Sequence, residues 1–218
     1  MKKFLFLVSS ALVFAASSHA ATINWGAQNT VGLADASGAA LAQGSLVRLG
    51  YFTITDSAIS TAVASGNMST LTSSWVSVAD TTVGTGTGVA GSFTLTSTPS
   101  LSGASLGHQI YLWALNAATV GSATQQAIFY EPSTTNSSWN FPGTNLTSTS
   151  IDIEQAKASL GGTYLAGSFQ TSNAALTALF SAPTGAVQLQ SISVAPEPSR
   201  MFLIFAGAGA FLIRRRRL

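Results

Sequence analysis

The sequence predicts an all-β domain, an antiparallel β-sandwich or jelly roll that carries one or two short helices. Apolar and polar residues alternate in 45–55, 109–115 and 187–194, which is the pattern of strands with one buried face. About eight or nine such short segments are separated by turns rich in Gly, Pro and Ser, and this spacing is typical of sandwiches and jelly rolls. The sequence has no internal repeat of fixed period, which argues against a solenoid.

The individual strands follow from local alternation and from aromatic spacing. The strongest signal is 109–115, where Tyr111 and Trp113 share one face. Residues 27–44 are small and Gly-rich, so we expect a loop there. The other strands are expected at 22–25, 45–55, 92–96, 126–130, 139–141, 150–153, 163–169 and 187–194.

Short helices are expected on the surface of this domain. Asp56 is a suitable N-cap for a first helix that ends at Gly66. Asn67 is a suitable N-cap for a second helix, with one apolar face formed by Leu71, Trp75 and Val78. Weaker helical patterns occur at 154–160, before a Gly-Gly stop, and at 173–180.

The first 20 residues have the parts of a secretory signal peptide. Lys2 and Lys3 form a positive start, and an apolar run covers 4–16. Ser18-His19-Ala20 places small residues at the two positions that a signal peptidase reads. We therefore expect signal peptidase to cleave between Ala20 and Ala21.

The last 23 residues contain three parts in a fixed order. They begin with a proline-bounded tetrapeptide, Pro196, Glu197, Pro198 and Ser199. An apolar run of 13 residues at 201–213 follows, and as a helix it would be roughly 20 Å long, against a hydrocarbon core of about 30 Å. A positive cluster then holds the tail on the cytoplasmic side of the membrane: Arg214, Arg215, Arg216 and Arg217.

This arrangement resembles the PEP-CTERM sorting signal of Gram-negative bacteria. The resemblance covers residues 196–218, about a tenth of the chain. It implies a transmembrane helix that anchors the chain in the inner membrane for a time. It also implies recognition near Pro196-Glu197-Pro198 by an exosortase, a membrane-embedded cysteine protease or transpeptidase. The mature protein would then move to the cell surface or the extracellular matrix. An ordinary C-terminal membrane anchor is the alternative.

Residues 21–195 remain as the exported domain, and their composition restricts their partners. The domain has two basic residues, Arg48 and Lys157, against six acidic ones, so its net charge is −4 although the whole chain is +2. Such a domain is a poor partner for nucleic acid. It contains no cysteine, so no disulfide staples it. Its many Ser and Thr hydroxyls are also possible sites for O-linked sugar.

The sequence offers few candidates for catalysis and none for a metal or another cofactor. His108 is the domain's one histidine, and nothing near it in sequence supplies the rest of a catalytic triad. Asp152 and Glu154 would share one face of a strand, and paired carboxylates can hydrolyse glycosides. A solvated face or a helix start is the simpler interpretation of these two residues. The aromatic residues could fill a core or form a sugar-stacking platform from Trp25, Trp75, Trp113 and Trp139.

These observations favour a non-enzymatic surface or matrix protein. The resemblance to PEP-CTERM proteins implies that it associates with extracellular polysaccharide in a biofilm. The alternatives are a carbohydrate-binding module with exposed aromatic residues and, third, a glycoside hydrolase. Solvent exposure distinguishes the three. Exposed tryptophans would favour sugar binding, and carboxylates facing a cleft would favour hydrolysis.

Overall fold

The structure is a computed structural model that describes residues 19–27, 30–101, 105–142, 148–180 and 183–193. Strands account for 38% of the described residues and helices for 21%, which confirms the prediction of a mostly β protein with short helices. The predicted signal peptide up to Ser18 and the predicted sorting tail, 196–218, lie outside the described residues. Within the described part, no helix is long and apolar enough to cross a membrane.

The largest sheet is antiparallel throughout, and two of the alternating segments, 45–55 and 109–115, form its centre. The expected strand at 187–194 is divided between two short strands in different sheets, β13 and β14. The order of the largest sheet is β11-β9-β8-β4-β5, with β14 paired to the start of β9. All of these strands except β11 and β14 have five or more residues. Their bounds are Leu46–Phe52 for β4, Trp75–Thr82 for β5, Tyr111–Leu115 for β8, Gln125–Tyr130 for β9, Thr163–Ala166 for β11 and Gln190–Ser191 for β14.

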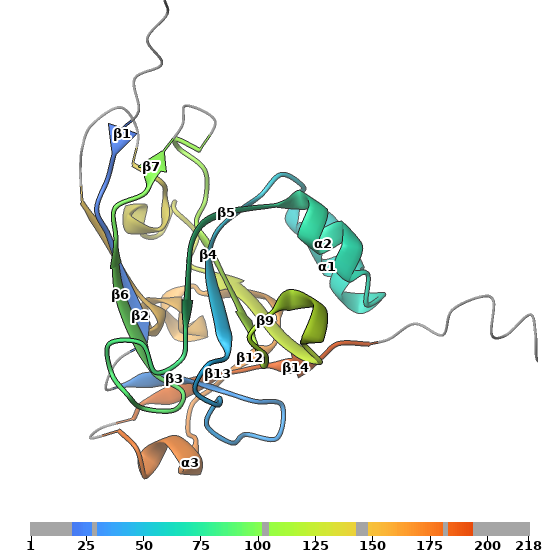
Figure 1. The fold of residues 1–218 in the computed structure, drawn as a ribbon, viewed down its shortest axis with the longest axis vertical. Helices are drawn as coiled ribbons and strands as arrows, with labels where there is room; N and C mark the ends of the chain where they lie inside the picture. Colours follow the sequence, from blue (N-terminus) through green and yellow to red (C-terminus); the bar gives the residue numbers. More distant parts are fainter. Residues whose placement is uncertain (1–18, 28–29, 102–104, 143–147, 181–182, 194–218) are drawn as a thin grey trace, which may run out of the picture.

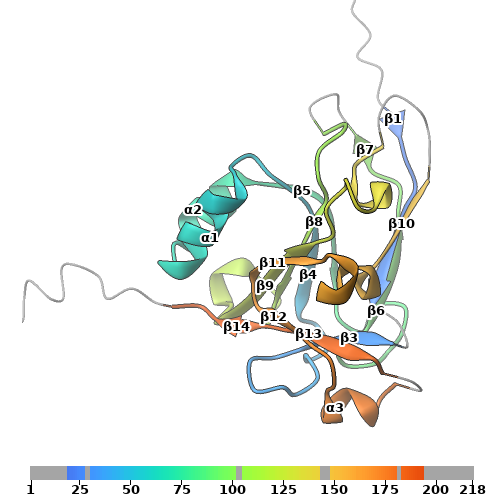
Figure 2. The same cartoon turned by 180° about the vertical axis from the view of Figure 1, so that it is seen from behind.

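Three smaller sheets complete the fold (Figures 1 and 2). One has the order β10-β2-β6, with bounds Thr149–Asp152, Ile23–Ala27 and Phe93–Ser97. Another has the order β12-β13-β3, with bounds Ser168–Gln170, Gly185–Gln188 and Val31–Ala34. The last pairs β1 with β7, His19–Ala20 with Ser100–Leu101.

The expectation of purely antiparallel sheets is wrong in two places. β10 pairs with β2, and β13 pairs with β3, in the parallel sense. β10 begins more than 100 residues after β2 along the chain, and β13 more than 100 residues after β3. These distances leave ample room for the crossover connection that parallel pairing requires.

The strand β3 was also not expected, because it lies inside the segment 27–44 that was predicted as a loop. All four of its residues are buried. A strand buried on both faces shows no alternation, so its sequence, Val-Gly-Leu-Ala, carries no period-two signal.

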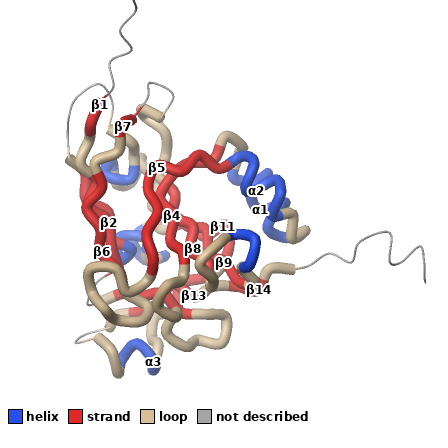
Figure 3. The backbone as a smooth tube through the Cα atoms, viewed as in Figure 1, coloured by secondary structure: helices blue, strands red, loops and turns tan. Residues whose placement is uncertain are grey.

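A single cluster of buried side chains joins the six-stranded sheet and the β10-β2-β6 sheet. Trp25 of β2 and Phe93 of β6 belong to the same cluster as Leu49 of β4 and Phe129 of β9. Leu49, Leu112 and Phe129 stand in register across three neighbouring strands, so they lie on the same face of the large sheet. The opposite face of that sheet is approached by the helices α1 and α2 (Figures 1 and 3).

Two of the expected helices are present, with shifted ends. α1 is Asp56–Ala64, and its N-cap is Thr55 rather than Asp56, because the Thr55 hydroxyl accepts the backbone N–H of Ala58 at 3.3 Å. α2 is Met68–Ser74, and Asn67 caps it as predicted. Trp75 and Val78 are not part of this helix but begin β5, where Trp75 packs against the aromatic side chains of neighbouring strands.

The remaining helical turns are short. α3 is Ala174–Thr177, capped by Asn173. The expected turn before Gly161 consists of two 3-10 turns, η3 (Ile153–Ala156) and η4 (Ala158–Leu160), and Gly161 ends the second with φ of 101°. Another 3-10 turn, η2 (Ser137–Trp139), replaces the expected strand at 139–141, and η1 (Val120–Ser122) connects β8 to β9.

Candidate functional site

The four tryptophans lie in the interior and form no surface platform. Their exposed fractions are 2% for Trp25, 8% for Trp75 and 0% for both Trp113 and Trp139. Three of the indole N–H groups donate to buried or half-buried partners: Trp25 to Ser97, Trp113 to Gln126 and Trp139 to Gln155, at 3.0 to 3.1 Å. The expected alternative of a sugar-stacking platform on these four residues is therefore wrong, because their ring faces are covered by protein.

Two of these rings instead cover a charge. The Arg48 guanidinium lies 5.7 Å from the ring centroid of Trp75 and 5.8 Å from that of Trp113. Arg48 also forms an ion pair with Asp80 on the adjacent strand, with Nε to Oδ1 at 3.1 Å. The Ser77 hydroxyl donates to the same Asp80 oxygen at 2.7 Å. The rings and the carboxylate thus hold the domain's only arginine against the sheet.

His108 is exposed and lies three residues before the start of β8. Its ring stacks on that of Tyr51, with centroids 4.4 Å apart and planes inclined by 18°. Its backbone carbonyl accepts the N–H of Phe141 at 2.9 Å. Among the described residues, no three His, Cys, Asp or Glu side chains come together in a group that could hold a metal ion.

Asp152 and Glu154 do not share a strand face, because β10 ends at Asp152 and η3 begins at the next residue. The Asp152 carboxylate accepts the N–H of Glu154 at 2.9 Å and completes a capping box with Gln155. Glu154 pairs with Lys157 at 2.6 Å. Burial raises the pKa of Asp152, whereas the hydrogen bond from Lys157 lowers the pKa of Glu154. Both carboxylates therefore stabilise a turn.

A carboxylate between two phenols is the polar cluster that the sequence did not predict. The Asp56 carboxylate accepts the hydroxyl of Tyr111 at 2.6 Å and also that of Tyr130. The two phenol rings are 4.7 Å apart. Burial and the hydrogen bond to Asp56 raise the pKa of both tyrosines, that of Tyr130 to about 12. The cluster fastens the first turn of α1 to β8 and β9.

This cluster depends on strand register, which explains why it was missed. Trp113 of β8 stands opposite Ile128 of β9, so Tyr111 and Tyr130, two positions further along, face the same side of the sheet. The sequence shows the two tyrosines but not that their strands are neighbours. Asp56 was predicted only as a helix cap.

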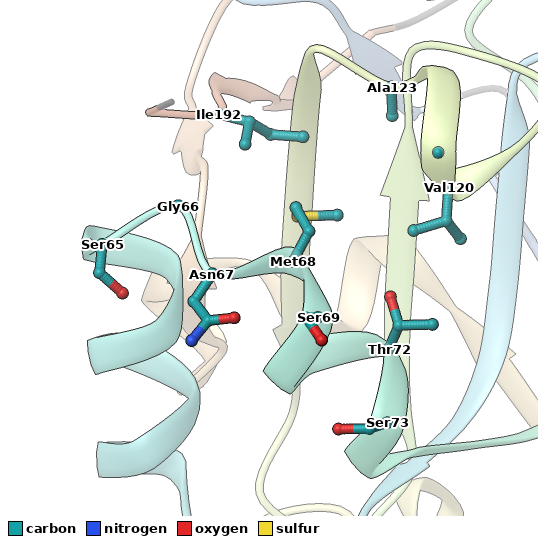
Figure 4. Close-up of a pocket in the computed structure, with 11 residues that line it drawn as sticks. Ser65, Gly66, Asn67, Met68, Ser69, Thr72, Ser73, Val120, Ala123 and Ile192 are labelled. Carbon is teal, nitrogen blue, oxygen red and sulfur yellow. The ribbon is translucent and has the colours of Figure 1, made fainter. Parts of the chain in front are cut away.

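An open hollow lies between α2, η1 and the end of β14 (Figure 4). Its volume is about 900 Å³, and it is open to solvent. Uncharged residues line it, with hydroxyls and an amide from the helices and apolar groups from Met68, Val120 and Ile192. We refer to it as the α2 pocket. No sequence pattern indicated it, because it is formed by three segments far apart in the chain.

The α2 pocket lies where the described chain ends. β14 pairs with β9, and the Ile192 N–H donates to the Thr124 carbonyl at 2.8 Å. The next residue, Ser193, is in close contact with Gly66, since a Cβ at Gly66 would lie 1.4 Å from the Ser193 carbonyl oxygen. Figure 1 shows β14 on the same side of the molecule as α1 and α2. The last described residues are thus fixed to one wall of the pocket.

Comparison with known proteins gives no relative: no family model matches the chain, and no curated protein or solved structure is detectably similar to it.

Proposed function

We propose that this chain is an exported, non-enzymatic protein of the cell surface or extracellular matrix, sorted through a C-terminal PEP-CTERM signal. The observation that carries the proposal is the order of parts at 196–218: the Pro-Glu-Pro motif, a short apolar run and four arginines. In this proposal residues 1–20 are removed by signal peptidase and residues 21–195 form the exported domain. The tail stays in the inner membrane until an exosortase-like enzyme cuts near Glu197.

The position of the motif in the sequence supports this proposal. Ser193 is the last described residue, it follows β14 and Ile192, and Pro196 lies three residues later. A cut near Glu197 would therefore remove no residue of the described fold.

The proposed role is structural rather than catalytic. The two carboxylates considered for glycoside hydrolysis are already engaged in capping a turn and in an ion pair with Lys157. The domain also has few charges and many hydroxyls, a composition suited to contact with neutral extracellular polysaccharide. Such contact would use hydroxyls and amides, because the four tryptophans are buried.

We also propose that the domain is a β-sandwich. The six-stranded sheet and the β10-β2-β6 sheet contribute to one hydrophobic core, which is the arrangement of two packed sheets. The two parallel pairs distinguish it from a regular jelly roll.

The experiment that tests the sorting proposal is an intact-mass measurement of the mature protein. The full chain is expressed in a Gram-negative host that has an exosortase and in the same host without it. We expect the first host to yield a product that begins at Ala21 and lacks 201–218, and the second to accumulate a membrane-bound form with the tail. Glu197→Ala should give that uncut form in both hosts. A mature wild-type product that still carries 201–218 in the exosortase host would contradict the proposal and leave a plain membrane anchor.

A further inference from the structure

We infer that the α2 pocket is the docking surface for the membrane peptidase that cuts the tail. This inference rests on the proposed function and specifies how the enzyme meets its substrate. It follows from the length of chain between the domain and the motif, and from the chemistry of the pocket.

The first argument is distance. Ser193 is fixed against Gly66, and Glu197 is four residues further along. Four residues span at most about 14 Å even when fully extended. A folded domain of the length of 21–195 has a radius of gyration of about 16 Å, so its diameter exceeds that reach. An enzyme that holds Glu197 in its active site must therefore press against the surface around Ser193.

That surface is the α2 pocket. Ile192 and Gly66 both line it, so the fixed end of the chain is one of its walls. The opposite wall is formed by Val120, Gly121 and Ala123 around η1, and α2 lies between the two (Figure 4). A partner that holds Glu197 within this reach of Ser193 therefore lies close to the pocket.

The chemistry of the pocket suits an uncharged partner surface. Met68, Val120 and Ile192 provide the apolar surfaces of the pocket, and Ser69, Thr72 and Ser73 provide exposed hydroxyls. A charged partner group placed here would lose water without gaining an opposite charge, because the lining residues carry none. The matching surface on the peptidase is therefore a small apolar projection surrounded by hydrogen-bonding groups, as in brief enzyme–substrate contacts.

The test introduces charges into the pocket without changing the tail. In Ser69→Asp/Thr72→Asp, two exposed lining positions of α2 become acidic. The matched control is Ser57→Asp/Ser60→Asp, which changes the second and fifth residues of α1 just as the first variant changes those of α2. The control positions are exposed and lie outside the pocket. Thermal unfolding of both variants shows whether the fold is intact.

The readout is the rate at which the full-length precursor loses its tail in exosortase-containing cells, followed by pulse-chase. We expect the pocket variant to be processed about tenfold more slowly than wild type, and the control at the wild-type rate. A ten-residue Gly-Ser spacer after Ser193 should remove the difference, because the enzyme could then hold Glu197 without touching the domain.

Equal processing of the pocket variant and wild type would overturn the docking inference while leaving the proposed function standing. A wild-type chain that is never processed would overturn both. If the pocket variant instead changes only the oligomeric state of the domain, with processing unaffected, the pocket binds a second copy and the inference is wrong.

Discussion

At the scale of single residues, Gly66 holds a position that no other residue type can fill without cost. Its φ is +66°, in the left-handed region, and a Cβ there would meet the Ser193 carbonyl oxygen at 1.4 Å. Gly66 thus combines a turn after α1 with close contact to the last described residue. The hydrogen-bonded turn between α1 and α2 depends on the first property, and the fixed exit of the chain depends on the second.

Substitution Gly66→Ala separates these two effects when it is compared with Gly88→Ala. Gly88 has φ of +68°, but no atom lies within 4 Å of its added Cβ. Gly88→Ala should cost about 1 kcal/mol of unfolding free energy through backbone strain alone. Gly66→Ala should cost about 2–4 kcal/mol, because it also displaces Ser193. Urea denaturation of residues 21–193 measures both, and equal losses would mean that the Ser193 contact contributes nothing.

The Asp56 cluster makes stability sensitive to alkaline pH. Burial and the hydrogen bond to Asp56 raise the pKa of Tyr130 to about 12, from an ordinary value of about 10. The folded state therefore holds the phenol proton more tightly than the unfolded state. This stabilisation is complete below about pH 10 and is lost as the pH rises through about 12.

Tyr130→Phe should flatten this pH dependence. At pH 8 the variant loses one hydrogen bond to a carboxylate, which should cost about 1–3 kcal/mol. Between about pH 10 and 12, its unfolding free energy should fall less steeply than that of wild type, because one fewer phenol with a raised pKa ionises. Urea denaturation at several pH values gives both slopes. Parallel slopes would show that the Tyr130 proton is not linked to folding.

At the scale of elements, the sequence predicts strands well where aromatic and branched residues continue over five or more positions. The segments 45–55, 109–115 and 126–130 form the centre of the large sheet, although all five residues of β8 are buried. The prediction fails for the short strand β3, which contains Gly32 and no aromatic residue, and where an aromatic residue fits either period. Trp75 fits a helical spacing with Leu71, yet it begins β5, because packing against Phe52 and Trp113 outweighs weak local propensity.

Sites made by contacts between distant elements could not be predicted, because their residues lie far apart in the sequence. Helix caps are local, so Asn67 and Gly161 were found from a few neighbouring residues. The Asp56 cluster requires the register of β8 against β9, and the α2 pocket requires three distant segments. The tryptophans were correctly considered as core residues, but only their burial in the structure excludes the surface platform.

The strand β14 is the element that ties the end of the chain to the domain. Its loss should destabilise the domain more than the loss of β1. Chain 21–193 lacks only the short β1–β7 pairing, since β2 keeps both of its neighbours, β6 and β10. Chain 21–189 additionally loses the β14–β9 pairing, the Ile192–Thr124 hydrogen bond and the Gln190 side chain that accepts the Gly167 N–H.

We expect chain 21–189 to lose about 2–4 kcal/mol of unfolding free energy relative to chain 21–193, which is several degrees in melting temperature for a domain of this size. Chain 21–193 should melt within about 2 °C of chain 19–193. Calorimetry on the three chains provides the comparison. A large loss on removing residues 19 and 20 would indicate that cleavage after Ala20 damages the fold, which would count against that cleavage site.

At the scale of the whole molecule, the charges are divided between the two ends of the chain and the domain. The domain has a net charge of −4, and seven of the nine basic residues are outside it: Lys2, Lys3, Arg200 and the terminal cluster. Within the domain, the two cations are each paired with a carboxylate, Arg48 with Asp80 and Lys157 with Glu154. The domain therefore presents no strong positive field to anionic lipid or nucleic acid, whereas the proposed sorting tail carries the charge that would stop it at a membrane.

The arginine cluster can be tested separately from the Pro-Glu-Pro motif. Replacing Arg214–Arg217 by four serines removes the charge that keeps the end of the tail on the cytoplasmic side. With an apolar run of only 13 residues and no charged stop, the tail should slip across the membrane. The variant should then be recovered outside the membrane with its tail uncut, because the motif no longer stays beside a membrane enzyme. Cell fractionation followed by intact mass measures location and processing together.

Four lysines in place of the four arginines provide the matched control. Lysine keeps the charge and lacks the planar guanidinium, so this variant should remain membrane-bound and be processed at about the wild-type rate if charge alone acts. If the lysine variant is retained in the membrane but left uncut, the enzyme reads arginine itself as part of its signal. If the serine variant is retained and processed normally, the apolar run suffices as a stop and the cluster has no role in anchoring.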